Sequence, residues 1–401
     1  MSGIVIIGAG QAGSSLAIKL RALGYQGKVT LIGEEPYAPY QRPPLSKTYL
    51  LGEMALERLY LRPEEVYRDQ NIELRLGTQV TAIDPVAQVI SLGAETLSYD
   101  QLALTTGSTP RLLPEAIGGR LQNVFAVRGL ADVDAMRPAF ERGGHVLIIG
   151  GGYIGLEAAA VAAKRGLKVT LVEMADRILQ RVACAQTSDY FRALHQSHGV
   201  TLLEGVGLSS LTGTDHVTAA ILSNGTTLDI DFALVGVGIQ PNTQLADAAG
   251  LTLNNGIETN ALGQTSQSKI WAAGDCASFP YQGERIRLES VPNAIDQAEV
   301  VAANMLGAQK AYHATPWFWS DQYDVKLQIA GLNQGFENVV TRIGEAGRSH
   351  WYYKAGQVLA VDAMNDPRAY MVAKRLIEAG KTADPALVAD PGSDLKALLR
   401  G

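Results

Sequence analysis

The sequence predicts an α/β protein built on two Rossmann-like dinucleotide-binding domains, followed by a C-terminal α+β domain. At residues 4–13 an apolar strand runs into a G-x-G-x-x-G turn that opens a helix, and the same arrangement returns at residues 146–155. The length of 401 residues leaves room for two or three domains. Two such turns in one chain indicate two dinucleotides that meet, and therefore a redox reaction.

The composition narrows the class of protein further. The formal charge of -6 contains no long run of one sign, so nothing favours nucleic-acid binding. No apolar run is long enough to span a membrane, and the first residues lack the cationic start and apolar core of a signal peptide. The two cysteines, Cys184 and Cys276, lie far apart in the sequence, so a disulfide framework is not expected. We therefore expect a cytoplasmic protein with neither membrane nor nucleic acid as a partner.

The first glycine turn has the features of a dinucleotide site. A strand is expected at 4–7 and a helix at 14–23. Gly8 permits the tight turn, Gly10 lets the backbone approach a pyrophosphate, and Gly13 lets the helix pack closely on the strand. The positive end of the helix favours the phosphate charge.

The next expected strands end in residues suited to the same ligand. The strand at 28–32 leads to Glu34, about 20 residues beyond the last glycine, where a carboxylate accepts hydrogen bonds from ribose hydroxyls. The apolar strand at 102–105 leads to Thr106 and Gly107, a small-residue turn that lets the backbone come close to a bound cofactor.

The second glycine turn indicates a nicotinamide dinucleotide. Its glycines are Gly150, Gly152 and Gly155, and a helix is expected from there to about residue 165. The following strand, 169–172, ends at Glu173, whose carboxylate accepts the ribose 2′-hydroxyl and repels a 2′-phosphate, so NAD is favoured over NADP.

Two further observations concern the cofactor preference and the end of this second domain. Arg177 and Arg181 could accommodate a phosphate and keep NADP open as an alternative. The strand at 234–237 ends at Gly238, the counterpart of Thr106 and Gly107, so the second domain is expected to be inserted into the first.

The segment Arg42-Pro43-Pro44-Leu45-Ser46-Lys47, together with the two glycine turns, resembles the FAD-dependent ferredoxin reductases of the putidaredoxin and rubredoxin reductase type. These are two-dinucleotide flavoproteins that share the glutathione reductase fold. The similarity runs through nearly the whole chain and is most specific at 41–47, 150–157, 270–276 and 289–294. The resemblance implies that the first turn holds FAD and the second NADH, and that electrons pass to a [2Fe-2S] ferredoxin that supplies a monooxygenase or dioxygenase.

The resemblance also implies further contacts with the flavin cofactor. They include Val80 in an expected strand, Asp275 after the strand at 270–273, and Val291 just before the helix expected at 295–305. Trp319 is implied to lie where electrons leave the flavin. The full set of predicted cofactor-binding residues is Gly8, Gly10, Ala12, Gly13, Glu34, Arg42, Lys47, Val80, Thr106, Gly107, Arg128, Gly150, Gly152, Tyr153, Ile154, Gly155, Glu173, Gly238, Asp275, Val291 and Trp319.

Lys47 and Glu157 are the predicted catalytic residues. A buried lysine beside the flavin needs a counter-charge, and Glu157 can supply it. Such a pair would polarise the flavin ring and hold the nicotinamide against it. The alternative is a plain ion pair that locks two parts of the fold together. Tyr153 is a candidate gate for the nicotinamide, with simple packing as its alternative.

Residues that are missing from the sequence exclude some reactions of related flavoproteins. No C-x-x-x-x-C pair is present, as disulfide reductases of this fold require, and Gln41, Arg42 and Pro43 stand where peroxide-reducing relatives carry a cysteine. None of the six histidines has metal-site spacing, so no metal is expected. Two alternative functions remain, a rubredoxin reductase and a redox-sensing signalling flavoprotein resembling apoptosis-inducing factor.

The expected domain boundaries follow from these assignments. The FAD-binding domain is expected at 1–109 and 243–315, the NAD-binding domain at 110–242, and the C-terminal α+β domain at 316–401. A monomer and a homodimer are both compatible with the sequence.

Overall fold

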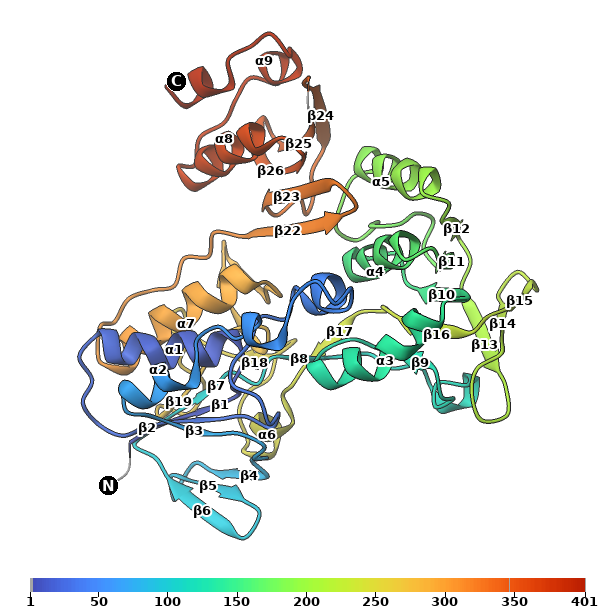
Figure 1. The fold of residues 1–401 in the computed structure, drawn as a ribbon. Coiled ribbons are helices and arrows are strands. Elements are labelled where there is room, and N and C mark those ends of the chain that lie inside the picture. Colours follow the sequence, from blue (N-terminus) through green and yellow to red (C-terminus); the bar gives the residue numbers. More distant parts are fainter. Residues whose placement is uncertain (1–2, 346, 401) are drawn as a thin grey trace. The chain divides into compact units, whose positions relative to one another are not determined.

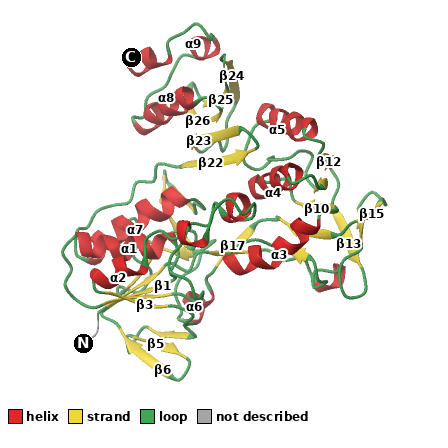
Figure 2. Cartoon of the chain, viewed as in Figure 1, coloured by secondary structure: helices red, strands yellow, loops and turns green. Residues whose placement is uncertain are grey.

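The computed structural model describes residues 3–345 and 347–400, which form two units (Figure 1). Unit 1 contains the residues up to Arg42, Met54–Thr109 and Ile239–Pro316. Unit 2 contains Pro43–Glu53, Pro110–Gly238 and the residues from Trp317 onward. Helices and strands alternate along much of both units (Figure 2).

Unit 1 is organised around a five-stranded parallel sheet with the order β19-β7-β1-β2-β3. Every residue of the central strand β1 is buried, which explains why it is apolar throughout rather than alternating. The strands are β1 (Ile4–Ile7), β2 (Val29–Ile32), β3 (Ile72–Arg75), β7 (Gln101–Leu104) and β19 (Ile270–Ala272).

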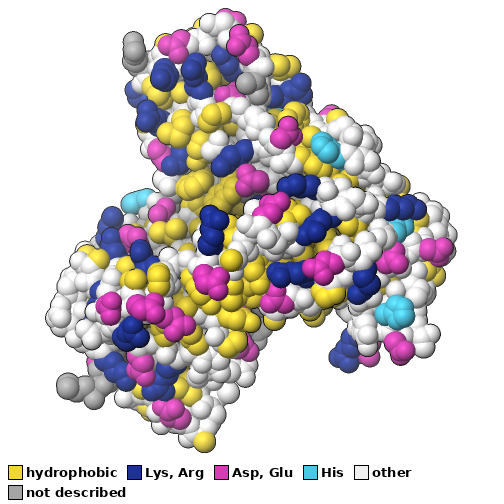
Figure 3. Space-filling view, in the orientation of Figure 1, with side chains coloured by type: hydrophobic (Ala, Val, Ile, Leu, Met, Phe, Trp, Pro, Cys, Tyr) yellow, Lys and Arg dark blue, Asp and Glu magenta, His cyan; other side chains and the backbone are white. Residues whose placement is uncertain are grey.

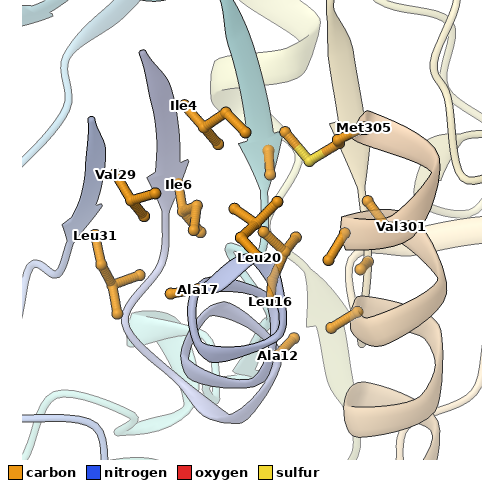
Figure 4. Close-up of a cluster of buried hydrophobic side chains, with 14 of the residues drawn as sticks. Ile4, Ile6, Ala12, Leu16, Ala17, Leu20, Val29, Leu31, Val301 and Met305 are labelled. Atoms are coloured by element: carbon orange, nitrogen blue, oxygen red, sulfur yellow. The ribbon is translucent and has the colours of Figure 1, made fainter. Parts of the chain in front are cut away.

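Helices α1 (Gln11–Ala22) and α7 (Val291–Met305) pack against each other and against one face of this sheet. Side chains from both helices meet those of β1 and β2 in a buried cluster, whose members include Ile4, Ile6, Leu16, Leu20, Val29, Leu31, Val301 and Met305 (Figure 4). Val5 and Ile7, which alternate with Ile4 and Ile6, belong to a second cluster on the opposite face. Burial on both faces fixes the position of the glycine turn that follows β1.

The remaining elements of unit 1 are short and surround this sheet. They are η2 (Leu56–Arg58), α2 (Glu64–Asp69), β4 (Ala82–Asp84), β5 (Val89–Leu92), β6 (Glu95–Ser98), β17 (Ile239–Pro241), α6 (Gln244–Ala248), β18 (Ile257–Glu258), β20 (Ala277–Tyr281) and β21 (Glu284–Ile286). Strand β8 (Ser108–Pro110) spans the residues at which the chain passes to unit 2.

Unit 2 repeats the parallel design with the strand order β12-β11-β10-β16-β9. Its strands are β9 (Val124–Phe125), β10 (His145–Ile149), β11 (Lys168–Glu173), β12 (Thr201–Glu204) and β16 (Phe232–Val235). The accompanying elements are η1 (Leu45–Tyr49), η3 (Glu115–Ile117), α3 (Leu130–Arg142), α4 (Tyr153–Lys164), α5 (Ala185–Ser197), β13 (Leu208–Thr212), β14 (Ala219–Leu222) and β15 (Thr227–Asp229).

The last part of unit 2 is a five-stranded antiparallel sheet with the order β22-β23-β26-β25-β24, and helix α8 packs on β23 and β26. Its elements are β22 (Trp317–Gln322), β23 (Val325–Gly331), β24 (Asn338–Ile343), β25 (Arg348–Lys354), β26 (Gln357–Met364), α8 (Pro367–Glu378), α9 (Pro385–Ala389) and η4 (Leu395–Arg400). The segment after residue 382, which gave no prediction from the sequence, therefore forms two short helices.

The surface carries charges of both signs. On the face shown in Figure 3, Lys and Arg side chains lie intermixed with Asp and Glu side chains. Within the described residues, no helix combines the length and apolar character needed to cross a membrane.

The structure corrects one predicted element and shifts two others. Val80 was expected in a strand but lies in the irregular segment between β3 and β4, where it is buried with Ile7 and Ile32. Its apolar character reflects this packing rather than strand pairing. Helices α1 and α7 begin at Gln11 and Val291, several residues earlier than predicted, because Gly10 and Ser290 act as their N-caps.

Two buried histidines connect the parallel and antiparallel halves of unit 2. His195 on α5 contacts Gln322 through its Nε2 at 2.8 Å, and His350 on β25 contacts Thr187 of α5 through its Nδ1 at 2.7 Å. Burial lowers the pKa of His195 to about 4 and that of His350 to about 4, so both rings are neutral near pH 7.

The unfolding free energy is therefore expected to fall as pH drops from about 6.5 to about 4. In that range an unfolded histidine binds a proton while folded His195 remains neutral until about pH 4. Each such histidine contributes a slope of about 1.4 kcal/mol per pH unit, and the contribution is fully present above the unfolded pKa. Denaturant unfolding at several pH values should give a shallower slope for His195→Gln than for the parent protein, and equal slopes would contradict a neutral buried His195.

Candidate cofactor and catalytic sites

Two glycines of the first turn are required by the fold itself. Gly8 follows β1 with φ +111°, and a Cβ there would lie 2.2 Å from the carbonyl oxygen of Thr105. A Cβ on Gly13 would lie 2.0 Å from the Gly8 oxygen. The Thr105 hydroxyl donates to that same Gly8 oxygen at 2.8 Å. Gly8 and Gly13 therefore serve close packing, and Thr105, which sequence analysis did not identify, fixes the turn.

Gly10 has a different role. It is the N-cap of α1, no side chain caps this helix end, and a Cβ on Gly10 would have no atom within 4 Å. The first N–H groups of a helix have no partner within the helix and attract an anion. Open space beside an uncapped helix start fits the pyrophosphate of a dinucleotide such as FAD.

The end of β19 lies against this helix start. A Cβ on Gly274 would lie 3.0 Å from the Cβ of Ala12, and Asp275 accepts a hydrogen bond from the Ser108 hydroxyl at 2.8 Å. Gln297 of α7 accepts from the Gly274 N–H at 2.8 Å, while its buried Nε2 has no hydrogen-bond partner among the described residues. This donor, which sequence analysis missed because a glutamine in a helix carries no motif, would suit a polar group of a cofactor.

Other predicted residues of unit 1 occupy the same end of the sheet. Glu34 is exposed just after β2 and accepts from Gln79 at 3.2 Å. Arg42 forms an ion pair with Glu35 at 2.5 Å and donates to the Tyr40 hydroxyl at 3.0 Å. These contacts hold the chain where it enters the segment that leads to Lys47.

Two further predicted residues are fixed by backbone contacts. The Thr106 hydroxyl donates to the Asn242 carbonyl at 2.7 Å, and the Asn242 N–H donates to the Gly107 carbonyl at 2.9 Å. Val291 is the first residue of α7, whose N-cap Ser290 accepts from the Asn293 N–H at 3.3 Å. The backbone of each of these residues is thereby held in place.

The glycines of the second turn have the same separate roles as those of the first turn, close packing and open space for a ligand. Gly150 has φ +107°, and a Cβ on Gly155 would lie 2.0 Å from the Gly150 oxygen. Gly152 caps α4 without a side-chain partner, and a Cβ there would have no atom within 4 Å. Tyr153 and Ile154 open the helix, and Ile154 is exposed. Unit 2 thus contains a second pyrophosphate-type site.

Glu173 is held at the edge of this second site. It ends β11, and its carboxylate accepts from the N–H groups of Gly151 at 2.7 Å and Ala175 at 2.8 Å. Arg177, the possible 2′-phosphate ligand, instead donates to the Ala183 carbonyl at 2.9 Å and to the Ser188 hydroxyl at 2.5 Å. A fixed acid and an occupied arginine favour NAD over NADP.

The remaining predicted residues of unit 2 lie on separate elements. Gly238 has φ +102° and accepts from the Arg111 N–H at 2.9 Å. The N–H of Arg128 donates to Asp132 at 2.8 Å just before α3. Trp319 lies half-buried in β22, with its ring 5.7 Å from that of Trp317.

Lys47 and Glu157 are in direct contact within unit 2. The Lys47 Nζ lies 2.9 Å from Glu157 Oε1, and the Ser320 hydroxyl donates to the same oxygen at 2.7 Å. Asp321 is farther from Lys47, at 3.9 Å. Burial raises the pKa of Glu157, and Lys47 and Ser320 oppose that rise. The result is a largely buried ion pair.

The backbone around Lys47 is anchored to α3 and α4. Lys47 lies in η1 at a kink of the chain, where its own backbone angles (φ -126°, ψ -109°) are not helical. The Tyr49 hydroxyl donates to Asp134 at 3.0 Å, and Arg165 donates to the Leu51 carbonyl at 2.7 Å. Lys164 pairs with Glu53 at 3.3 Å on the surface. These contacts hold Lys47 over the second turn of α4.

Within the described residues, no three His, Cys, Asp or Glu side chains are grouped as a metal site. Both cysteines are buried and free, Cys276 in unit 1 and Cys184 in unit 2.

The different roles of the glycines can be separated by substitution. Gly152→Ala should melt at the temperature of the parent protein, because its Cβ would meet nothing, yet bind NADH about tenfold more weakly or worse. Gly155→Ala should lose about 1–3 kcal/mol of stability, because its Cβ would meet the Gly150 carbonyl. Thermal melting and NADH titration distinguish the two variants, and an unchanged NADH affinity in Gly152→Ala would contradict the assignment.

Comparison with known proteins is consistent with this geometry. Residues 2–298 match the pyridine nucleotide-disulphide oxidoreductase family, and residues 317–399 match the reductase C-terminal family. Putidaredoxin reductase CamA of Pseudomonas putida is 41% identical over 406 residues, which cover 99% of this chain and 96% of that protein. Rhodocoxin reductase of Rhodococcus erythropolis is 40% identical over 98% of this chain and 93% of that protein.

Solved structures give the same result. The covalent putidaredoxin reductase–putidaredoxin complex matches with a TM-score of 0.95 and 39% identity, covering 100% of this chain and 98% of that chain. The ferredoxin reductase for the CYP199A2 system from Rhodopseudomonas palustris matches with a TM-score of 0.95 and 40% identity, covering 99% of each chain.

These matches confirm the resemblance seen in the sequence, the expected fold class, the assignment as an oxidoreductase and the cofactors FAD and NADH. The contacts of individual residues with either cofactor, and the three domain boundaries, stay predictions. The chain belongs to the pyridine nucleotide-disulphide oxidoreductase family and is one of its putidaredoxin-reductase-like flavoproteins.

Proposed function

We propose that this chain transfers electrons from NADH through FAD to a [2Fe-2S] ferredoxin that supplies a monooxygenase or dioxygenase. One NADH and two oxidised ferredoxins give NAD+, two reduced ferredoxins and one proton. The relatives bear out this reaction class, since they include putidaredoxin reductase and the ferredoxin–NAD+ reductase component of an anthranilate 1,2-dioxygenase system. The expected function is thus supported by proteins similar to nearly the whole chain.

The positions of the two cysteines favour this function over disulfide reduction. The family is described by its disulfide chemistry, which requires a pair of neighbouring thiols. This chain has two cysteines, and Cys184 and Cys276 are separate in sequence, free and buried. Electrons therefore have to leave by a route other than a dithiol, and an external one-electron acceptor meets that need.

The protein binds and positions the two dinucleotides. When bound, FAD supplies the two-electron acceptance and one-electron release that no side chain can perform. The uncapped starts of α1 and α4 bind the two pyrophosphates beside Gly10 and Gly152. Glu34 and Glu173 accept ribose hydroxyls, and the second of these acids selects NADH over NADPH.

Lys47 and Glu157 act where hydride crosses between the cofactors. The proposal is supported by their burial and by the 2.9 Å contact between them. A charge pair in a site shielded from water interacts more strongly with reacting groups than an exposed pair does. Lys47 orients the flavin side, Glu157 holds the lysine in place, and the pair excludes water from the reacting faces.

The remaining features of the proposal concern the setting of the reaction. We place it in the cytoplasm, where thiols such as Cys184 and Cys276 stay reduced. The partner is a [2Fe-2S] ferredoxin, and the active species is a monomer or a homodimer.

Absorbance spectroscopy tests the function directly. NADH should bleach the flavin spectrum, and adding a [2Fe-2S] ferredoxin should restore it repeatedly while NADH is consumed. Faster turnover with a rubredoxin would favour the rubredoxin reductase alternative. A long-lived NADH–flavin complex with no electron delivery to either acceptor would contradict the proposal and favour a redox sensor.

Removing the lysine should slow flavin reduction. Lys47→Ala should reduce the stopped-flow rate of flavin reduction by NADH about tenfold or more, which corresponds to about 1.4 kcal/mol of activation free energy. Lys164→Ala is the matched control, because it removes an exposed ion pair between the same segment and α4. Equal rates in Lys47→Ala and the parent protein would show that the buried pair is only structural.

A further inference from the structure

Strand β22 runs along helix α4 with matched spacing. The ring of Phe318 lies 5.0 Å from that of Tyr153, and the hydroxyl of Ser320 contacts Glu157 at 2.7 Å. Two strand residues advance about 6.6 Å and four helix residues about 6 Å, so each second residue of β22 meets each fourth residue of α4. Gln322 is the next residue after Ser320 on the same face of β22. It therefore lies one step farther along α4 than the contact between Ser320 and Glu157.

A chain of buried side chains continues from that point. Gln322 Nε2 donates to the Ser320 hydroxyl at 3.2 Å, and His195 Nε2 lies 2.8 Å from Gln322 Oε1. The Tyr323 hydroxyl lies 3.1 Å from His195 Nδ1. Ser320, Gln322 and His195 are each 0% exposed. The row therefore runs through the protein interior from Glu157 to the half-buried Tyr323.

The hydrogen-bond directions follow from donor and acceptor chemistry. An ionised Glu157 only accepts, so Ser320 uses its single proton on the carboxylate and must accept from Gln322. The Gln322 oxygen then accepts from the N–H at Nε2 of the neutral His195 ring. This tautomer leaves Nδ1 without a proton, so Nδ1 accepts from the Tyr323 hydroxyl. Every donor in the row points toward Glu157.

Such a row stabilises negative charge at one end. Aligned hydrogen bonds polarise one another, and a donor strengthened in this way stabilises a buried carboxylate. The amide of Gln322 interrupts any path for proton hopping, because an amide does not readily exchange its proton along a chain. The row is therefore suited to holding Glu157 ionised rather than to moving protons.

We propose that Gln322 and His195 are positioning residues that hold the Ser320 hydroxyl as a donor to Glu157 and so keep Glu157 ionised and aligned with Lys47. This inference rests on the proposed role of the Lys47–Glu157 pair in hydride transfer. Burial, which raises the pKa of Glu157, is the effect that the row opposes.

The charged and titratable groups around the row are few. Lys47 from η1 and Asp321 from β22 face Glu157, with Lys47 favouring and Asp321 opposing its ionised form. His198, the C-cap residue of α5, and Tyr323 from the turn after β22 face His195. Lys47 is thus the cationic partner of Glu157, and the donor row is its polar partner.

Gln322→Glu tests the direction of the row with almost no change of shape. The new carboxylate can still accept from His195, but it competes with Glu157 for the Ser320 proton. The acidic limb of the pH profile for flavin reduction by NADH should move up by about one pH unit, and the rate at the old midpoint should fall about fivefold. Ser320→Ala, which removes the last donor and adds no bulk, should shift the profile in the same direction.

A matched variant separates this effect from general destabilisation. Ser349 is also a fully buried serine of the same antiparallel sheet, and it contacts Trp351 and Asp366. Ser349→Ala should lower the melting temperature without moving the pH profile. If Gln322→Glu and Ser320→Ala lower the melting temperature and leave the pH profile where it was, the row is structural and the inference is wrong.

A double-mutant cycle separates this inference from the function on which it rests. Glu157→Gln should slow flavin reduction, and adding Gln322→Glu to it should slow it no further. An equal additional loss in the double variant would mean that Gln322 acts independently of Glu157 and would overturn the inference alone. A parent-like rate in Glu157→Gln would overturn the catalytic role of the pair and this inference with it.

Discussion

An ionised carboxylate withdrawn from water is the constraint on which the organisation of unit 2 depends. Removing a carboxylate from water costs several kcal/mol unless a counter-charge and hydrogen-bond donors replace the lost hydration. At Glu157 those replacements are the Lys47 ammonium at 2.9 Å and the Ser320 hydroxyl at 2.7 Å. Both therefore have to be held in place by structure of their own.

The need to hold the Lys47 ammonium and the Ser320 hydroxyl in place explains one feature of the fold each. The kinked turn η1 and the contacts of Tyr49 and Leu51 with neighbouring helices hold Lys47 over α4. The alignment of β22 with α4 brings Ser320 to the same carboxylate, although 163 residues separate the two. The antiparallel sheet thus contributes to the candidate catalytic pair as well as carrying Trp319.

The two glycine turns show how a short motif serves both folding and binding. In each turn the outer glycines, such as Gly8 and Gly13, avoid collisions of about 2 Å with backbone oxygens. The middle glycines, Gly10 and Gly152, face open space beside an uncapped helix. Identical residues in one motif therefore serve different physical roles.

Much of the fold could be predicted from the sequence because its signals are local. The apolar strands, the glycine turns and the acids Glu34 and Glu173 lie within short stretches whose spacing carries the information. Val80 was misassigned to a strand because its apolar character reflects packing with Ile7 and Ile32 in an irregular segment.

The parts of the site that could not be predicted are contacts between distant residues. Thr105, Ser320, Gln322 and His195 carry no motif, and Gln297 is an ordinary helical residue until its unpaired amide is seen. The Lys47–Glu157 contact was predicted because the family resemblance implies Lys47 as a flavin contact and a buried lysine needs a counter-charge such as Glu157. Local pattern fixes neither the partner nor the direction of a buried hydrogen bond.

The charge state of Glu157 is the most direct test of this account. Infrared spectra of the parent protein and Glu157→Gln, recorded near pH 7, would reveal a carbonyl stretch of a protonated carboxylic acid by its loss in the variant. The account predicts no such difference, because Lys47 and Ser320 keep Glu157 ionised. A protonated-carboxyl band that disappears in Glu157→Gln would contradict the buried ion pair and everything derived from it.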